Sequence, residues 1–111
     1  MKENNEYFEY ARRVADELEE YAAGTVTDDN GEPLTMYDYV ADALDIEYTV
    51  DSRKTYLGAR IYVTLGGPTV WIDTRGKTVE LRWGADSATA LLSYDAAEQL
   101  DDIMSEIYDE F

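Results

Sequence analysis

The sequence predicts an α+β fold: an antiparallel sheet of four to five strands, with three helices packed mainly on one face. Three features of the 111 residues predict it. Apolar residues recur at helical spacing near both ends of the chain, they alternate with polar residues through its middle, and short turns with Gly or Pro separate the alternating segments. Strands joined by such turns and flanked by helices are typical of this class. The length suits one domain, 1–111, with a single core.

Two helices are predicted in the first part of the chain, over 5–22 and 36–45. One apolar stripe runs along the first and contains Phe8, Ala11, Val14, Ala15, Leu18, Tyr21 and Ala22. The turn-rich acidic segment 25–34 should be an exposed loop. Thr35 and Asp38 have the spacing of a capping box, so we expect the second helix to begin directly after Thr35.

Alternation of apolar and polar residues predicts strands at about 46–51, 57–65, 69–74, 78–83 and 88–92. In the second of these the residues expected to be buried are Ala59, Ile61, Val63 and Leu65. Arg75, Gly76 and Lys77 form the predicted turn of a hairpin. Ser93 should cap a last helix over 94–110. Its predicted inward residues are Ala97, Leu100, Ile103, Met104, Ile107 and Phe111.

The composition excludes several kinds of chemistry. The chain has no cysteine and no histidine, which rules out disulfides, thiolate zinc sites, cysteine nucleophiles and histidine bases. No apolar run approaches the roughly 20 residues that span a bilayer, and the N-terminal segment does not resemble a signal peptide, so we expect a cytoplasmic protein. A net charge of -16 should repel nucleic acid and anionic membranes and favour basic partners.

No catalytic residue, metal site or cofactor is predicted, and we expect no enzymatic activity. Asp73 and Glu80 could act as a pair of catalytic carboxylates, but Arg75, Lys77 and Arg82 lie close in sequence and favour cross-strand charge pairs instead. The acidic segment TDDNGE lacks the 12-residue spacing of a calcium loop, and a turn is the better interpretation.

The charges are unevenly distributed along the chain. Residues 53–82 hold six of the nine bases and two acids, whereas 25–52 and 83–111 each hold eight acids and no base. We therefore expect a basic sheet that counters acidic helices, with Arg60, Arg75 and Arg82 offsetting the helix carboxylates. A solvated acidic surface that only keeps the protein soluble is the alternative to a functional one.

The last predicted helix is the most acidic element, with seven carboxylates on about 16 residues. At about 1.5 Å of rise per residue this gives one charge per roughly 3.4 Å, close to the phosphate density of a DNA strand. Its acids also form a ladder at i,i+4 spacing, in which each of three like-charged pairs should cost about 0.2–0.5 kcal/mol. The ladder consists of Glu98, Asp102, Glu106 and Glu110.

From 36 to 111 the sequence resembles a group of small acidic proteins encoded by phages and other mobile elements of gut bacteria. The segment LGGPTVWIDTRGKTVELRW and the acidic helix that closes the chain carry the resemblance. In that group asparagine often follows GGP and a second tryptophan often follows the one at Trp83, whereas this chain has Thr69 and Gly84. The resemblance implies a protein that blocks a host defence, as anti-CRISPR and anti-restriction proteins do by occupying DNA-binding surfaces.

The leading hypothesis is therefore an anti-CRISPR-like inhibitor whose carboxylates mimic phosphates and bind the basic groove of a nucleic-acid-binding protein, with a Cas nuclease as candidate. The alternative is a structural or regulatory interaction module of a mobile element, with incidental acidity and contacts through its sheet. Tyrosines among the acids are the expected aromatic anchors. The predicted partner-binding residues are Asp95, Glu98, Asp101, Asp102, Glu106, Asp109, Glu110, Asp38, Asp42, Asp45, Tyr37, Tyr39 and Tyr108.

Overall fold

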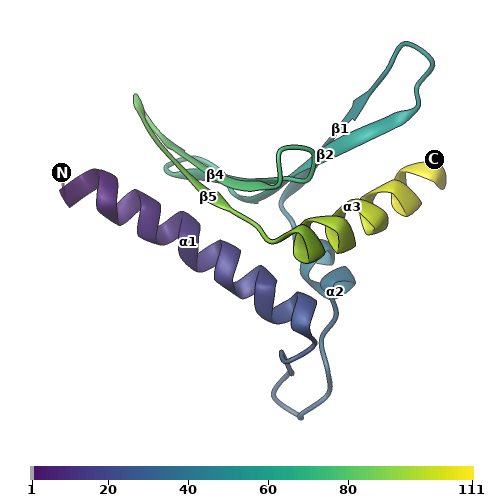
Figure 1. Cartoon of the computed structure of the whole chain (residues 1–111), viewed down its shortest axis with the longest axis horizontal. Coiled ribbons are helices and arrows are strands. Elements are labelled where there is room, and N and C mark those ends of the chain that lie inside the picture. Colours follow the sequence, from purple (N-terminus) through teal and green to yellow (C-terminus); the bar gives the residue numbers. More distant parts are fainter. Residues whose placement is uncertain (1) are drawn as a thin grey trace.

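A computed structural model describes the backbone from Lys2 to Phe111 and the side chains from Glu6 onward. It confirms the α+β fold, with three helices and five strands (Figure 1). The elements are α1 (Lys2–Ala23), α2 (Met36–Ala41), β1 (Asp45–Val50), β2 (Tyr56–Thr64), β3 (Thr69–Asp73), β4 (Thr78–Trp83), β5 (Asp86–Leu91) and α3 (Tyr94–Asp109).

The five strands form one sheet in the order β1-β2-β3-β4-β5, and every neighbouring pair is antiparallel. The hairpin predicted around Gly76 joins β3 to β4, with Asp73 opposite Thr78. Its turn forms because the Asp73 carboxylate accepts hydrogen bonds from the backbone N–H groups of Arg75 and Gly76, both at 3.0 Å. Connections this short cannot form a crossover to a distant strand, so each strand pairs with the next one in the sequence.

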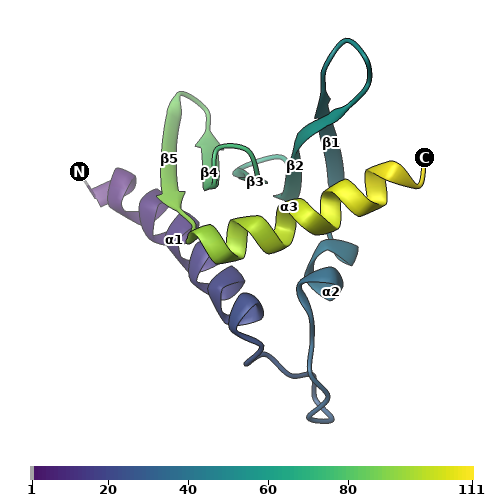
Figure 2. The ribbon, with the colours of Figure 1, turned by 45° about the vertical axis from the view of Figure 1, so that its right-hand side comes forward.

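All three helices lie on the same side of the sheet (Figures 1 and 2). α1 packs across β4 and β5, α3 packs across β2, and α2 contacts both of the longer helices. The core lies between the two layers, and its largest fully buried side chains are Leu18, Ile61, Val70, Ile72, Val79, Leu81, Leu100 and Met104. Because successive strand residues point to opposite faces, the second face of the sheet is left without a covering layer in the described chain.

The capping box of α2 is confirmed, but this helix is shorter than predicted. The Thr35 hydroxyl accepts a hydrogen bond from the N–H of Asp38, and the Asp38 carboxylate accepts one from the N–H of Thr35. α2 ends at Ala41 instead of residue 45 because the N–H of Leu44 donates to the carbonyl of Tyr62, at 2.9 Å, and this bond draws the chain into β1.

Phe8, Leu65 and Phe111 were predicted to face the core but are exposed, and so is Leu44, which was predicted to lie in the buried stripe of the second helix. Phe8, Leu65 and Phe111 keep 47%, 53% and 88% of their surface accessible. Phe8 lies on α1 beside Tyr7, which packs against the core in its place. Leu65 follows the last residue of β2, where the chain leaves the sheet, and Phe111 lies beyond the end of α3.

Candidate functional site

The helical layer, defined as residues 6–44 and 92–111, carries the net charge of the protein. It contains eighteen acidic residues and two basic ones, Arg12 and Arg13, which gives -16. The remaining described segment, 45–91, contains six acids and six bases and is neutral. The expectation of a basic sheet was wrong, because the same sheet includes β1, the turn after it and β5. The acids of these segments, Asp45, Glu47, Asp51 and Asp86, balance the excess of bases in 53–82.

The basic residues of the sheet do not neutralise the helix carboxylates, contrary to the sequence-based expectation. Arg60 and Arg82 occupy strand positions that alternate with the buried residues, so they point away from the helices. Arg75 lies in the β3–β4 turn with its side chain against Gly58. Among the side chains of residues 6–111, one ion pair forms, between Arg12 and Asp16 at 3.0 Å on α1.

α3 displays its acids on a single sector of its surface. α3 contains six carboxylates and its C-cap residue, Glu110, adds a seventh. At 100° per residue, six of these seven fall within about 120° of the helix circumference, opposite the buried stripe of Ala97, Leu100 and Met104. All six are exposed: Asp95, Glu98, Asp102, Glu106, Asp109 and Glu110. We call these residues the α3 acidic sector. The last turn of α3 contains no base, so nothing within the helix offsets the carboxylates there.

The remaining carboxylate of α3, Asp101, is used inside the fold. Its Oδ1 accepts hydrogen bonds from the hydroxyl of Tyr56 at 2.7 Å and from that of Thr74 at 3.0 Å. Thr74 is buried and also accepts a hydrogen bond from the N–H of Ala59. Asp101 therefore joins α3 to β2 and to the β3–β4 turn. Its half-buried position separates it from the other predicted binding acids.

Tyr108 also contributes to the fold. Its hydroxyl donates a hydrogen bond to the carbonyl of Lys54 at 2.7 Å. Its ring lies 5.2 Å from the ring of Tyr48 and 5.9 Å from that of Tyr56, measured between centroids. This predicted anchor is half-buried and fixes the end of α3 to the β1–β2 hairpin.

The predicted acids outside α3 are not brought together. Asp45 lies in β1 opposite Tyr62, on the sheet face that points away from the helices. Asp38 is exposed on α2 but serves in its capping box. Asp42 is exposed at the C-terminal end of the same helix. Tyr37 is 56% exposed and is the most accessible of the three predicted aromatic anchors.

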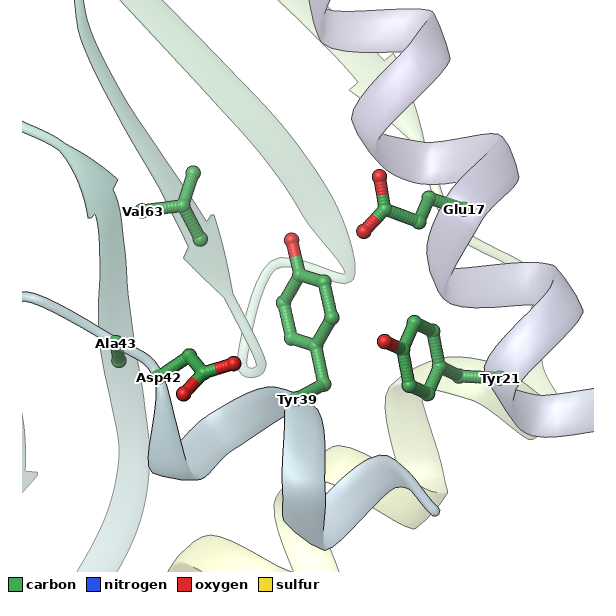
Figure 3. Close-up of a pocket in the computed structure, with 6 residues that line it drawn as sticks. All are labelled: Glu17, Tyr21, Tyr39, Asp42, Ala43 and Val63. Atoms are coloured by element: carbon green, nitrogen blue, oxygen red, sulfur yellow. The ribbon is translucent and has the colours of Figure 1, made fainter. Parts of the chain in front are cut away.

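Tyr39 lies in a pocket between α1, α2 and β2 with a volume of about 210 Å³ (Figure 3). Its ring contacts that of Tyr21 edge to face, with 5.1 Å between centroids. The carboxylates of Glu17 and Asp42 lie on opposite sides of it. Burial, and next the Glu17 carboxylate, raise the pKa of the Tyr39 hydroxyl well above its ordinary value. The same two causes raise the pKa of Tyr21.

Sequence reasoning missed two members of this pocket, Glu17 and Tyr21. Both lie on α1, outside the segment that carries the family resemblance, and Tyr21 was assigned only to the buried stripe. Their i,i+4 spacing places them on one side of α1 and could have indicated a shared site. The contribution of α2 could not be read in the same way, because it depends on how the two helices pack.

The carboxylates of Asp73 and Glu80 are occupied by local hydrogen bonds. Asp73 accepts from backbone N–H groups in its own turn, and Glu80 accepts from the hydroxyls of Thr78 and Thr89 at 2.6 and 2.7 Å. The predicted cross-strand pairs with arginine or lysine do not form within 4.0 Å. They fail because Arg75 turns toward Gly58 and the hydroxyls on either side of Glu80 satisfy its oxygens.

In the part of the chain that the structure describes, no group of three carboxylates is placed to hold a metal ion. Among the described helices, none combines the length and the hydrophobicity that a transmembrane span requires. No protein-family model, curated protein or solved structure matches the chain.

Proposed function

We propose that this protein is a non-enzymatic, anti-CRISPR-like inhibitor of a CRISPR-Cas nuclease. In this proposal the α3 acidic sector takes the place of nucleic-acid phosphates and occludes a basic DNA-binding groove. The observation that supports it is the sector itself: six exposed carboxylates on one side of a helix, without a counter-ion among the described side chains. The resemblance to small acidic proteins of phages and mobile elements supports this role, and the proposed inhibitor would act in the cytoplasm of a bacterial host.

The energetic cost of the sector favours a functional role over incidental acidity. Like charges at i,i+4 spacing destabilise a helix by about 0.2–0.5 kcal/mol per pair. Anions in the last turn, here Asp109 and Glu110, also oppose the helix dipole. Solubility alone does not require acids at these positions, because a net charge of magnitude about 2–8 suffices for a small domain. A basic groove would offset the repulsion on binding.

A second candidate is a structural or regulatory interaction module that binds through the open face of the sheet. We define the open face by Glu47, Arg60, Tyr62, Trp71, Glu80, Arg82 and Thr89. Its favouring observation is an aromatic pair, Tyr62 and Trp71, with 5.9 Å between ring centroids. The Arg60 guanidinium lies 5.9 Å from the centroid of the Trp71 ring, so at this point the face combines two aromatic rings with one cationic side chain.

Two triple variants that each remove three negative charges separate the candidates. The first carries Glu98→Gln, Asp102→Asn and Glu106→Gln in the α3 acidic sector. The second carries Asp45→Asn, Glu47→Gln and Glu80→Gln on the sheet. Each new amide keeps one acceptor oxygen, and at position 80 the amide NH2 can donate to the second of the two threonine hydroxyls that now donate to Glu80. Binding to a purified Cas nuclease would be measured across a salt series, with and without DNA.

We call the first variant the helix triple and the second the sheet triple. If the protein is the inhibitor, the helix triple should bind the nuclease at least tenfold more weakly than the parent, because each lost charge contact costs about 0.5 kcal/mol or more. The sheet triple should bind almost as tightly as the parent. Binding of the parent should weaken with added salt and compete with DNA. If the sheet triple loses the partner and the helix triple keeps it, the interaction module is the correct function. A nuclease that remains fully active with saturating protein would refute inhibition.

A further inference from the structure

The polar residues that line the pocket between α1, α2 and β2 all favour a positively charged ligand. Two tyrosine rings and two carboxylates line it, together with Ala43 and Val63 (Figure 3). None of its lining residues is basic. Tyrosine rings carry negative charge density on their faces, so all four polar walls attract a cation. An anion would instead face Glu17 and Asp42.

The polar groups of the pocket are not engaged elsewhere. Neither the Glu17 nor the Asp42 carboxylate makes a hydrogen bond or ion pair with any described side chain, and the Tyr39 hydroxyl has no hydrogen-bond partner there. Arg13 lies four residues before Glu17 on α1 and could pair with it. Its guanidinium lies over the ring of Tyr10 instead, at 5.4 Å from the centroid. The pocket therefore keeps two unpaired negative charges beside its aromatic walls.

The size of the pocket selects the kind of cation. Its volume of about 210 Å³ is below the roughly 300–1,000 Å³ of pockets that hold drug-sized ligands. One ammonium or guanidinium group and part of its alkyl stem fit such a space. A second, more open depression on α1 shares Glu17 with the pocket and is lined also by Tyr10, Arg13, Val14, Asp16 and Glu20. A side chain that enters the pocket can therefore belong to a longer segment lying on α1.

We propose that the Tyr21–Tyr39 pocket binds the ammonium or guanidinium group of a lysine or arginine side chain from the basic partner protein. Only the source of the cation rests on the proposed function, whereas the chemistry of the pocket stands by itself. Glu17 and Asp42 neutralise the charge, and the two rings contact the group and its stem. The pocket would serve as an aromatic anchor point beside the carboxylates of the helical layer.

Nuclear magnetic resonance of the full chain with labelled tyrosines tests the pocket directly. The probes are n-butylammonium and n-butylguanidinium, and the matched neutral probe is 1-butanol. Both cations should shift the ring signals of Tyr21 and Tyr39 in a saturable way, and 1-butanol should not. Equal shifts with 1-butanol would show an apolar cavity and overturn the proposal, as would the absence of any saturable shift.

Single substitutions then locate the binding. Glu17→Gln and Asp42→Asn should each lower the affinity for the cation about two- to fivefold. Glu98→Gln, which makes the same charge change on α3, should leave this affinity unchanged. Tyr39→Phe keeps the ring and should keep binding, while Tyr39→Leu should weaken it about threefold or more. An equal effect of Glu98→Gln and Glu17→Gln would indicate general attraction to an acidic protein and refute a specific pocket.

A last comparison separates this inference from the proposed function. In one outcome the helix triple no longer binds a nuclease that the parent binds, yet n-butylammonium does not shift the ring signals of Tyr21 and Tyr39. The pocket proposal is then wrong, and the proposed inhibitor function still stands. If the tyrosines shift and Glu17→Gln also weakens the nuclease complex, the cation is the partner's side chain. If they shift equally well with spermidine and Glu17→Gln leaves the complex unchanged, the assignment to a partner side chain is overturned.

Discussion

Asp101 and Asp102 are neighbours on α3 with opposite environments. Asp101 is half-buried and accepts hydrogen bonds from Tyr56 and Thr74, whereas Asp102 is exposed within the α3 acidic sector. Both residues are aspartate, yet Asp101 has a structural role and Asp102 is a surface carboxylate. This pair provides a matched test of that division, because the same substitution can be made one residue apart.

Asp101→Ala should lower the free energy of unfolding by about 1–3 kcal/mol, because the buried hydroxyl of Thr74 loses its acceptor. Asp102→Ala should change it by less than about 0.5 kcal/mol, since it removes one exposed charge from a like-charged ladder. Urea denaturation at neutral pH measures both. Equal losses for the two variants would contradict the structural role of Asp101.

The hydroxyl of Tyr56 makes the free energy of unfolding depend on pH in the alkaline range. Burial is the main cause of its raised pKa, and the nearby Asp101 carboxylate adds to it. The folded protein therefore holds this proton above pH 10, the ordinary pKa of tyrosine, where the unfolded chain has released it. The unfolded state then binds fewer protons than the folded state, so stability falls as pH rises above about 10.

Tyr56→Phe should be less stable than the parent at pH 8, by about 1 kcal/mol for the lost hydrogen bond. Its stability should then fall less steeply between pH 9.5 and 11 than that of the parent, because the titrating group is absent. Urea denaturation midpoints over this interval give both curves. Parallel curves would mean that Tyr56 does not cause the alkaline loss.

At the scale of elements, α3 opposes its own helix dipole. Its last turn contains no base, and Asp109 and Glu110 lie where the dipole disfavours anions. Asp109→Lys should therefore raise the free energy of unfolding by about 0.3–1 kcal/mol at low salt. Asp109→Asn should give a smaller gain, because it removes the unfavourable charge without adding a favourable one. Thermal denaturation monitored by circular dichroism compares them, and a loss of stability in the lysine variant would contradict the prediction.

The elements predicted best were those set by local sequence. Thr35 and Asp38 fix the start of α2 through bonds over three residues, and the turn at Gly76 fixes the β3–β4 hairpin in the same way. The exposed acids of α3 could also be predicted, because helical periodicity places them opposite the apolar stripe. The end of α2 was predicted less well, because it depends on a contact with a distant residue: the N–H of Leu44 donates a hydrogen bond to the carbonyl of Tyr62.

The internal role of Asp101 and the Tyr39 pocket could not be predicted for a related reason. Asp101 bonds to Tyr56 and Thr74, which lie 45 and 27 residues away. The Tyr39 pocket needs α1 and α2 to meet at Tyr21. Periodicity gives the face on which a residue lies but not the residue that faces it. The charge of the sheet was misjudged because blocks of sequence do not coincide with layers of the fold.

At the scale of the whole molecule, the charge is separated between two layers. The protein is flat, with extents of 43 × 43 × 24 Å, and the helical layer carries -16 while the sheet is neutral. An approaching basic surface would be attracted to the helical layer and not to the open face. Such a field increases the rate of association and orients the encounter, and salt weakens both effects.

The same charge separation predicts opposite effects of salt on stability and on binding. Raising NaCl from 10 to 200 mM should increase the melting temperature by a few degrees, because salt screens repulsion among the helix carboxylates and little attraction is lost with one ion pair among the described side chains. The affinity for a basic partner should fall over the same series. Calorimetry at each salt concentration measures stability. A melting temperature that falls with salt would indicate attractive ion pairs in the fold.

Glu19 of α1 helps to set the direction in which the α3 acidic sector points. Its carboxylate accepts hydrogen bonds from the backbone N–H of Ser93 at 2.7 Å and from the Ser93 hydroxyl at 2.5 Å. These bonds hold the first turn of α3 at one rotation about the helix axis. A slip of one residue would turn every carboxylate by about 100°, and part of the sector would face the sheet. The orientation of the most acidic surface in the protein is thus set in part by a carboxylate that does not belong to it.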